Sequence, residues 1–277
     1  MFKFQKIMFA GAAAAVTMTA LASGVCKIDK RSGHTEVLSG KYRLVTSNAK
    51  GNFAVSAFSV DGKEYMYYAG LSIKEKGGKV TYNEANTPAG KCTELRADAK
   101  EGKIFWQHKY EWDFVNMIRT IETGDYPGFK LTCDIEVMRD FEFERVCMSL
   151  RLPYKNVYNR TGYIKNGIIQ FRPHRKAEWF AILKNKNFPY ITFSGDTVKE
   201  AVMIAAGNMA SWNRLPTTLL YSTNDKCYWT AEFMYQFGKT LKKGEKHSFS
   251  VYIIPISSDN VAGEAQENFI KIKNFIK

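Results

Sequence analysis

The chain has 277 residues, 45% of them hydrophobic, and its 40 Lys and Arg against 27 Asp and Glu give a formal net charge of +13 at pH 7. Such a charge favours an anionic partner. Because no motif combines basic with aromatic residues as nucleic-acid binding requires, we expect acidic or sulfated polysaccharide and no nucleic acid. Lysines that serve only solubility are the alternative interpretation.

Residues 1–22 have the features of an export signal. Lys3 and Lys6 precede an apolar stretch from Ile7 to Leu21, which ends in an A-x-A-type cleavage site. The stretch is shorter than the ~20 residues that a bilayer requires, so we expect cleavage and no stable membrane span afterwards. A retained anchor is the alternative.

We expect the mature protein, residues 23–277, to be periplasmic or secreted. Loss of the two signal lysines leaves it with a charge of +11. No Pro/Ser-rich linker and no short repeat divides it, which predicts a single domain. Lipidation of Cys26 is an alternative fate, although the Leu that a lipobox places three positions upstream is missing.

Strand patterns fill most of this mature chain. Short runs of β-branched and aromatic residues alternate with turn residues at intervals of about ten. An Asp61-Gly62 pair predicts a hairpin between a strand that ends at Val60 and one over Glu64–Tyr68. The other predicted strands are Tyr42–Ser47, Asn52–Val60, Lys103–Tyr110, Trp112–Glu122, Phe129–Met138, Glu142–Leu152, Gly167–Phe171, Lys199–Ala206, Thr217–Ser222, Tyr228–Tyr235 and His247–Pro255.

The C-terminus follows a helical pattern instead. From Asp259 onward, apolar residues recur at helical spacing, and Asp259 or Asn260 is expected to cap the first turn. So many strands do not fit one flat open sheet. We therefore predict an all-β protein of large, stacked antiparallel sheets with a concave face and a short C-terminal helix.

Five cysteines remain after cleavage, so the odd number leaves at least one without an intramolecular disulfide. Their spacing contains no C-x-x-C pair of the kind that binds zinc. Cys133 and Cys147 are predicted to lie on one hairpin with its turn near Arg139-Asp140. They would form either a disulfide or two buried thiols.

The strand over Lys103–Tyr110 brings three candidate site residues to one face. Trp106, His108 and Tyr110 alternate along it. Aromatic rings stack on the C–H faces of sugars, and a neutral imidazole can act as an acid or a base near pH 7. This face is therefore either a sugar platform or part of the hydrophobic core.

Five further residues are candidates for a carbohydrate site. Arg172 and Arg175 flank His174 and could bind a carboxylate or sulfate in a bidentate manner. Glu232 could serve as a base, and Trp212 lies between polar amides and an arginine. The structural alternatives are a solvated loop for His174 and its two arginines, and an exposed strand position for Glu232. For Trp212 the alternative is a loop position in which the ring covers a sheet edge. No phosphate-loop, nucleophile-elbow, zinc-protease or dinucleotide motif is present, so no cofactor or metal is predicted.

Two segments resemble a known superfamily. The stretch from Phe53 to Glu64, F-A-V-S-A-F-S-V-D-G-K-E, resembles the opening hairpin of galactose mutarotase-like proteins. The stretch from Leu241 to Tyr252, L-K-K-G-E-K-H-S-F-S-V-Y, is similar to the L-x-P-G-E turn and final strand of aldose epimerases. The resemblance implies a β-supersandwich over nearly the whole mature chain.

The resemblance also implies a role with carbohydrates. Family members include sugar mutarotases and supersandwich domains of polysaccharide lyases, and in the mutarotases two histidines and a carboxylate act on the sugar. His108, His174 and Glu232 are the partial matches in this chain. The family's N-x-x-N-H-L-H-G-G and N-H-s-Y-F-N-L sequences are missing from this chain. The sequence therefore predicts an exported carbohydrate-binding or carbohydrate-processing protein, isomerase-like or lyase-like if it is an enzyme. The alternative is a non-catalytic envelope β-sandwich protein that binds polyanionic glycans.

Overall fold

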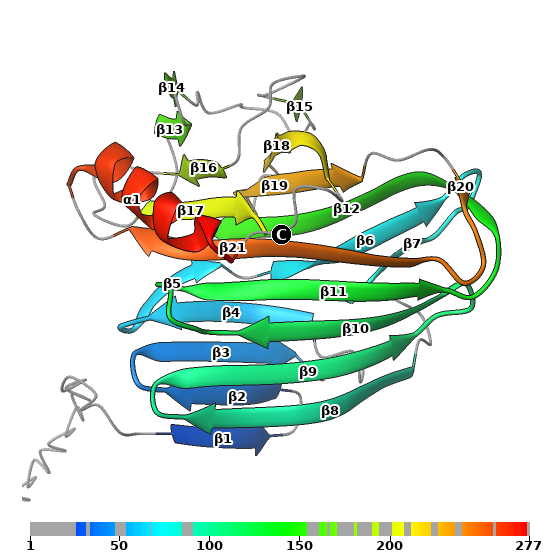
Figure 1. Cartoon of the computed structure of the whole chain (residues 1–277), viewed down its shortest axis with the longest axis horizontal. Helices are drawn as coiled ribbons and strands as arrows, with labels where there is room; N and C mark the ends of the chain where they lie inside the picture. The colour runs from blue at the N-terminus through cyan, green and yellow to red at the C-terminus, as the bar shows by residue number, and fades with distance from the viewer. Residues whose placement is uncertain are drawn as a thin grey trace, which may run out of the picture.

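The structure is a computed structural model in which antiparallel strands form three sheets and one helix closes the chain (Figure 1). For residues 26–27, 31, 91, 152–153, 161–164, 167–170, 180–181, 212–222 and 227–235 only the backbone is described. The residues described are 26–31, 34–47, 54–66, 68–84, 91–153, 161–164, 167–170, 180–181, 190–193, 201–207, 212–222, 227–235, 240–256 and 259–275.

The first sheet is an antiparallel meander of five strands that follow one another in the sequence. At its last turn, Asp61 and Gly62 both have positive φ, 51° and 78°, as a two-residue hairpin with the natural strand twist requires. The strands, in order across the sheet, are β1 (Cys26–Arg31), β2 (His34–Ser39), β3 (Tyr42–Ser47), β4 (Ala54–Val60) and β5 (Lys63–Met66). The predicted D-G hairpin is confirmed.

The second sheet has nine strands and carries most of the long strands of the fold. Along Lys103–Glu111, Val115–Glu122 and Phe129–Val137, buried side chains alternate with more exposed ones, which is the pattern of a sheet with one face in the core. Its order is β14 (Gly167–Gln170), β13 (Thr161–Ile164), β16 (Tyr190–Phe193), β17 (Ala201–Ala206), β21 (Lys246–Ile256), β11 (Phe129–Val137), β10 (Val115–Glu122), β9 (Lys103–Glu111) and β8 (Lys91–Lys100).

The third sheet has six strands on its main path, and a seventh strand pairs with the start of the central one. Its central strand, β12 (Phe141–Pro153), pairs with β6 (Tyr68–Glu75) on one side and with β19 (Cys227–Tyr235) on the other. The order is β15 (Phe180–Ala181), β18 (Trp212–Ser222), β19 (Cys227–Tyr235), β12 (Phe141–Pro153), β6 (Tyr68–Glu75) and β7 (Thr81–Asn83), with β20 (Thr240–Leu241) paired to β12.

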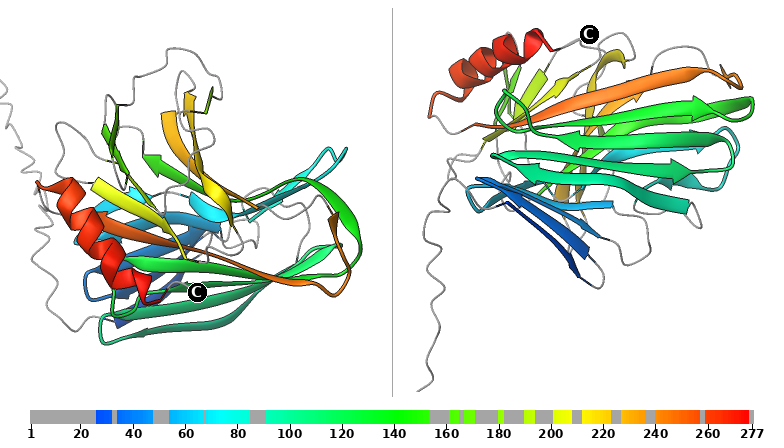
Figure 2. Two further views of the ribbon diagram at one scale, coloured as in Figure 1. Left: turned by 45° about the horizontal axis from the view of Figure 1, so that its top comes forward. Right: turned by 60° about the horizontal axis from the view of Figure 1, so that its bottom comes forward.

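The sheets stack in layers around one hydrophobic core. Figure 2 shows the five-stranded sheet as a layer beside β8 to β11, and the core contains side chains from all three sheets. Phe58 of the first sheet packs edge-on against Phe129 of the second, with ring centroids 4.0 Å apart. The prediction of an all-β supersandwich with a short C-terminal helix is confirmed.

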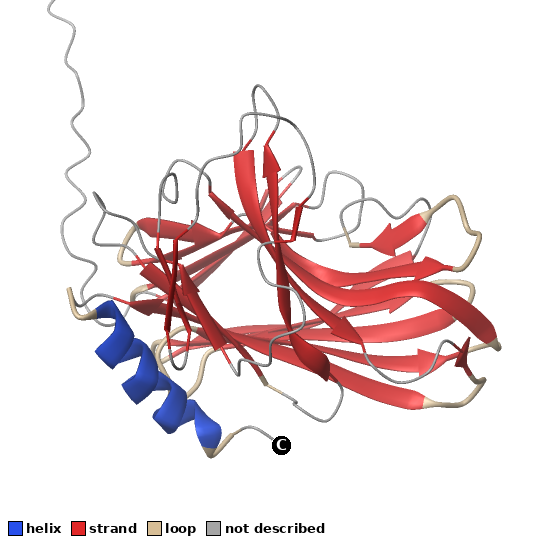
Figure 3. Cartoon of the chain, turned by 90° about the horizontal axis from the view of Figure 1, so that it is seen from above, coloured by secondary structure: helices blue, strands red, loops and turns tan. Residues whose placement is uncertain are grey.

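Helix α1 (Val261–Lys273) covers part of the outer face of the nine-stranded sheet (Figure 3). The side chain of Asn260 caps the helix by accepting a hydrogen bond of 3.1 Å from the N–H of Gly263. Buried Ala265 and Ile272 pack with Tyr252 and Ile254 of β21 in a second, smaller core. Of the two predicted caps, Asn260 is the one observed.

The predicted hairpin of Cys133 and Cys147 is wrong. Cys133 lies on β11, which pairs with β10 and β21, whereas Cys147 lies on β12 in the seven-stranded sheet. The turn near Arg139 and Asp140 thus carries the chain from one layer to the other. Both cysteines are buried thiols, which matches the second of the two alternatives.

Candidate functional site

The candidate face of β9 points into the space between the sheets. Trp106 and His108 are 0% exposed and Tyr110 is 1% exposed. Their rings follow one another along the strand, with centroids 5.0 Å apart for Trp106 and His108 and 6.4 Å apart for His108 and Tyr110. This position matches the core alternative of the sequence analysis, while a role for the three side chains in sugar contact stays a prediction.

A buried arginine from the neighbouring strand extends this face. Arg119 lies directly across from His108 in the register of β9 and β10 and is also 0% exposed. Its Nη2 is 3.2 Å from Nδ1 of His108, and its guanidinium carbon lies 5.3 Å from the ring centroid of Tyr110. Since the guanidinium is always charged, this nitrogen of the imidazole accepts the hydrogen bond and the ring is neutral.

Glu84 supplies a buried carboxylate whose charge is opposite to that of Arg119. It follows β7 in the seven-stranded sheet, which faces β9 and β10. It is 0% exposed, and its carboxylate accepts hydrogen bonds from the N–H of Leu71, at 3.2 Å, and from the hydroxyl of Tyr68, at 3.4 Å. The carboxylate lies against Gly70, where any side-chain carbon would overlap it. We call Glu84, Arg119, His108, Tyr68 and Tyr110 the buried polar cluster.

Burial determines how these groups ionise. It lowers the pKa of His108 to about 2, and the charges of Arg119 and Lys30 act in the same direction. It raises the pKa of Glu84, which the nearby Arg119 partly opposes. It also raises the pKa values of Tyr68 and Tyr110 well above the usual value, so both phenols stay protonated and act as hydrogen-bond donors.

At neutral pH the cluster is therefore a buried set of fixed donors and acceptors. Because its pKa is lowered, the imidazole of His108 is neutral at pH 7. The predicted catalytic role of His108 stays a prediction. Next to the cluster, at the edge strand β8, the indole N–H of Trp106 donates to the partly exposed Glu94 at 3.1 Å. Glu94 also forms an ion pair of 2.5 Å with Lys30 of β1, which connects the edges of two sheets.

A cysteine at this edge is held in its thiol form by burial. Cys92 lies on β8 across from Tyr110 and is partly buried. Burial raises the pKa of its thiol to about 11, so the thiolate that would act as a nucleophile or metal ligand is scarce. Among the described residues, no group of three or more His, Cys, Asp or Glu side chains could hold a metal ion.

The other predicted site residues are not brought together with His108 by anything that the structure describes. Glu232 lies on β19, opposite Ser149 of β12, and Trp212 begins β18 instead of lying in a loop. Their side chains are outside the described part, as are Arg172, His174 and Arg175 as a whole. The predicted convergence of His108, His174 and Glu232 stays a prediction.

Sequence reasoning missed Glu84 and Arg119. For Arg119 a signal exists, since it occupies an inward position in the alternation of Val115, Met117 and Ile121. For Glu84 the local sequence gives no signal, because its burial depends on how β7 and β6 pack on the opposite sheet.

Comparison with known proteins identifies the fold. No protein-family model matches the sequence, and no curated protein sequence matches it significantly. A putative aldose 1-epimerase from Klebsiella pneumoniae is similar in structure, with a TM-score of 0.58 and 10% identity over 91% of this chain and 87% of that one. The heparan sulfate lyase HepC from Pedobacter heparinus has a TM-score of 0.54 and 10% identity, over 84% of this chain and 37% of that one.

A third similar structure is the α-N-acetylgalactosaminidase NagBb from Bifidobacterium bifidum. Its TM-score is 0.55 and its identity 8%, over 89% of this chain and 39% of that one. The chain therefore has the galactose mutarotase-like fold, and the resemblance seen in its sequence is confirmed at the level of the fold. In the described part of the chain, no helix is both long and apolar enough to cross a membrane.

Proposed function

We propose that this protein is an exported carbohydrate-binding protein, periplasmic or secreted, whose ligand is an acidic or sulfated polysaccharide. The observation that carries the proposal is the fold, because the similar structures bear the names of an epimerase, a lyase and a glycosidase, all of which act on sugars. A fold alone does not assign chemistry. The choice of ligand therefore rests on charge.

The excess positive charge is concentrated in one part of the sequence. Residues 154–200 contain nine Lys and Arg against three Asp and Glu, and they include Arg172 and Arg175. In the described part, by contrast, many basic side chains are in ion pairs, such as Arg139 with Glu75 and Lys242 with Asp140. A cationic segment in a chain whose other charges are mostly balanced supports a polyanionic ligand.

Binding without turnover is favoured by one specific observation. The histidine that the mutarotase resemblance makes a catalytic candidate, His108, is buried and stays neutral. A general acid or base has to reach the proton that it transfers and titrate near the working pH. The competing function, an isomerase-like or lyase-like enzyme, would have to use His174 and Glu232 without His108.

The experiment compares binding with turnover on the mature protein. Heparin, polygalacturonate and dextran are titrated calorimetrically, while anomer exchange of free sugars and absorbance of unsaturated products are followed in parallel. Binding of the two polyanions without either reaction supports the proposal. Turnover that is lost in both His174→Gln and Glu232→Gln but retained in His108→Gln would establish the enzyme instead, and absence of binding to any glycan would overturn the proposal.

A further inference from the structure

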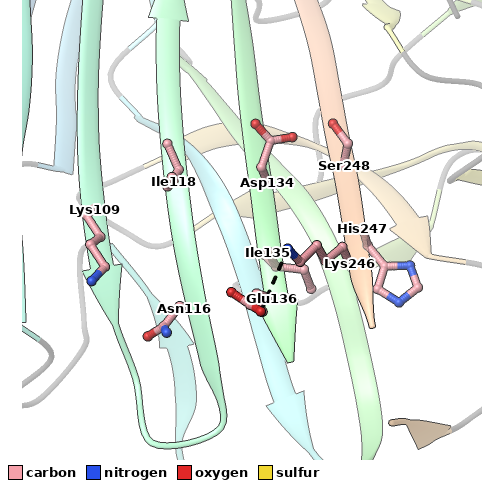
Figure 4. Close-up of a pocket in the computed structure, with 9 residues that line it drawn as sticks. All are labelled: Lys109, Asn116, Ile118, Asp134, Ile135, Glu136, Lys246, His247 and Ser248. Carbon is pink, nitrogen blue, oxygen red and sulfur yellow. Dashed lines mark ion pairs between the residues drawn. The ribbon is translucent and has the colours of Figure 1, made fainter. Parts of the chain in front are cut away.

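The outer face of the nine-stranded sheet is polar where helix α1 does not cover it. At this uncovered end lies a hollow of about 490 Å³, within the range of about 300–1,000 Å³ that is typical of small-molecule sites. Figure 4 shows its side chains on four adjacent strands, β9, β10, β11 and β21.

The register of the strands arranges these side chains in two cross-strand rows. One row runs from Lys109 through Ile118 and Asp134 to Ser248, and the next includes Asn116, Glu136 and Lys246. Opposed residues on one face of adjacent antiparallel strands lie close together. The hollow therefore presents ammonium, amide and carboxylate groups around one apolar side chain, Ile118, which is 37% exposed.

Asp134 differs from the other carboxylates on this face. Glu111 pairs with Lys109 at 2.5 Å, Glu122 with Lys130 at 3.6 Å, and Glu136 with Lys246 at 3.9 Å. Within the described part of the chain, Asp134 forms neither an ion pair nor a side-chain hydrogen bond, and Figure 4 shows its carboxylate next to Ser248. The distance of 3.9 Å between Nζ of Lys246 and Oε1 of Glu136 is too long for a direct hydrogen bond. Both groups can therefore still form hydrogen bonds with a ligand.

We propose that this hollow binds a neutral oligosaccharide with vicinal hydroxyl groups, through side chains other than those of the basic segment 154–200. A carboxylate accepts two hydroxyl hydrogens in parallel, and an ammonium group donates to a hydroxyl or ring oxygen. The charges of two lysines and two carboxylates balance, so the hollow has no net positive charge that would attract a polyanion. The exposed side chain of Ile118 gives the C–H face of a sugar ring an apolar contact.

The test uses neutral hexasaccharides of glucose, mannose, galactose and xylose, with a heparin hexasaccharide as the anionic comparison. Each is titrated into the mature wild type and into Asp134→Asn, Ile118→Ala and the matched control Asp125→Asn, whose carboxylate is exposed at a turn. We expect at least one neutral hexasaccharide to bind. Its affinity should fall at least about tenfold in Asp134→Asn and Ile118→Ala and stay unchanged in the control.

The outcomes separate this site from the proposed function. Heparin binding should be the same in all four proteins, because it depends on other side chains. Neutral binding that is equal in wild type and both hollow variants would overturn the site, as would the absence of binding for all four neutral hexasaccharides. If the wild type binds a neutral hexasaccharide but does not bind heparin, that result would instead count against the polyanion proposal. Thermal melts confirm that each variant is folded, which the exposure of Asp134 and Ile118 leads us to expect.

Discussion

The carboxylate of Glu84 lies so close to the backbone of Gly70 that no side chain fits between them. Gly70 is in the interior of β6, where an alanine would ordinarily be preferred. We predict that Gly70→Ala destabilises the protein by about 1–3 kcal/mol, since the added methyl group overpacks a buried site. Urea unfolding measures this loss.

A double-mutant cycle tests that the overlap with Glu84 is the cause. Glu84→Ala alone should cost about 1–3 kcal/mol, because it leaves the buried hydroxyl of Tyr68 and the N–H of Leu71 without their acceptor. In the Glu84→Ala background, however, Gly70→Ala should add less than about 0.5 kcal/mol. Additive costs would show that Gly70 is required for another reason.

The second prediction concerns the pH dependence of stability. His108 has a pKa of about 2 in the folded protein against 6.5 for an unperturbed histidine. Between these values the unfolded chain binds the additional proton, so stability is lost as the pH falls below 6.5. The loss from this residue amounts to about 1.4 kcal/mol per pH unit. Glu84, Arg119, Tyr110 and Lys30, the other ionisable groups near it, are the same in wild type and variant.

His108→Asn removes this titration and keeps a hydrogen-bonding group beside Arg119. Its free energy of unfolding, measured in urea at pH 7, 6, 5 and 4, should therefore depend less steeply on pH than that of the wild type. Parallel pH profiles would mean that His108 titrates normally in the folded protein, and the buried position would then be incorrect.

The pattern of alternating residues predicted many of the strands, but it missed β1, β2, β6 and β8 and did not predict the layers. The strand Tyr42–Ser47 was predicted with its observed bounds, and the helix cap within one residue. The link between Phe129–Val137 and the next strand was misread as a hairpin, because the sequence shows a turn but not whether the chain stays in its sheet. Only the pairing partners decide this, and they are distant in the sequence.

The buried polar cluster was predictable only in part, for the same reason. His108 and Tyr110 share a strand face, which period-two alternation shows directly. Glu84 and Arg119 come from two sheets that meet only after folding, so their proximity depends on sheet stacking. Stacking leaves no local pattern in the sequence.

The third prediction separates a core role from a sugar-contact role for Trp106. Its side chain is 0% exposed, so Trp106→Ala should cost about 3–5 kcal/mol and lower the melting temperature strongly. Gln107→Ala, on the opposite face of the same strand, is the control and should cost less than about 1 kcal/mol. An unchanged melt of Trp106→Ala together with lost glycan binding would contradict the core interpretation.

The last prediction tests the electrostatic part of the proposed function. If the basic segment 154–200 holds a polyanion, the affinity for heparin should fall steeply between 0.1 and 1 M salt, because the Debye length shrinks from about 10 to about 3 Å. Replacing Arg172, Arg175 and Lys176 together by glutamine should weaken binding at 0.1 M salt and also reduce the dependence on salt, since fewer charges are then screened. Replacing Lys100, Lys103 and Lys130, which form ion pairs in the described part of the chain, should have a much smaller effect. Calorimetric titration at several salt concentrations distinguishes the two sets. Equal effects of both would show that net charge alone attracts heparin, and an affinity that does not change with salt would exclude a role for the basic charge.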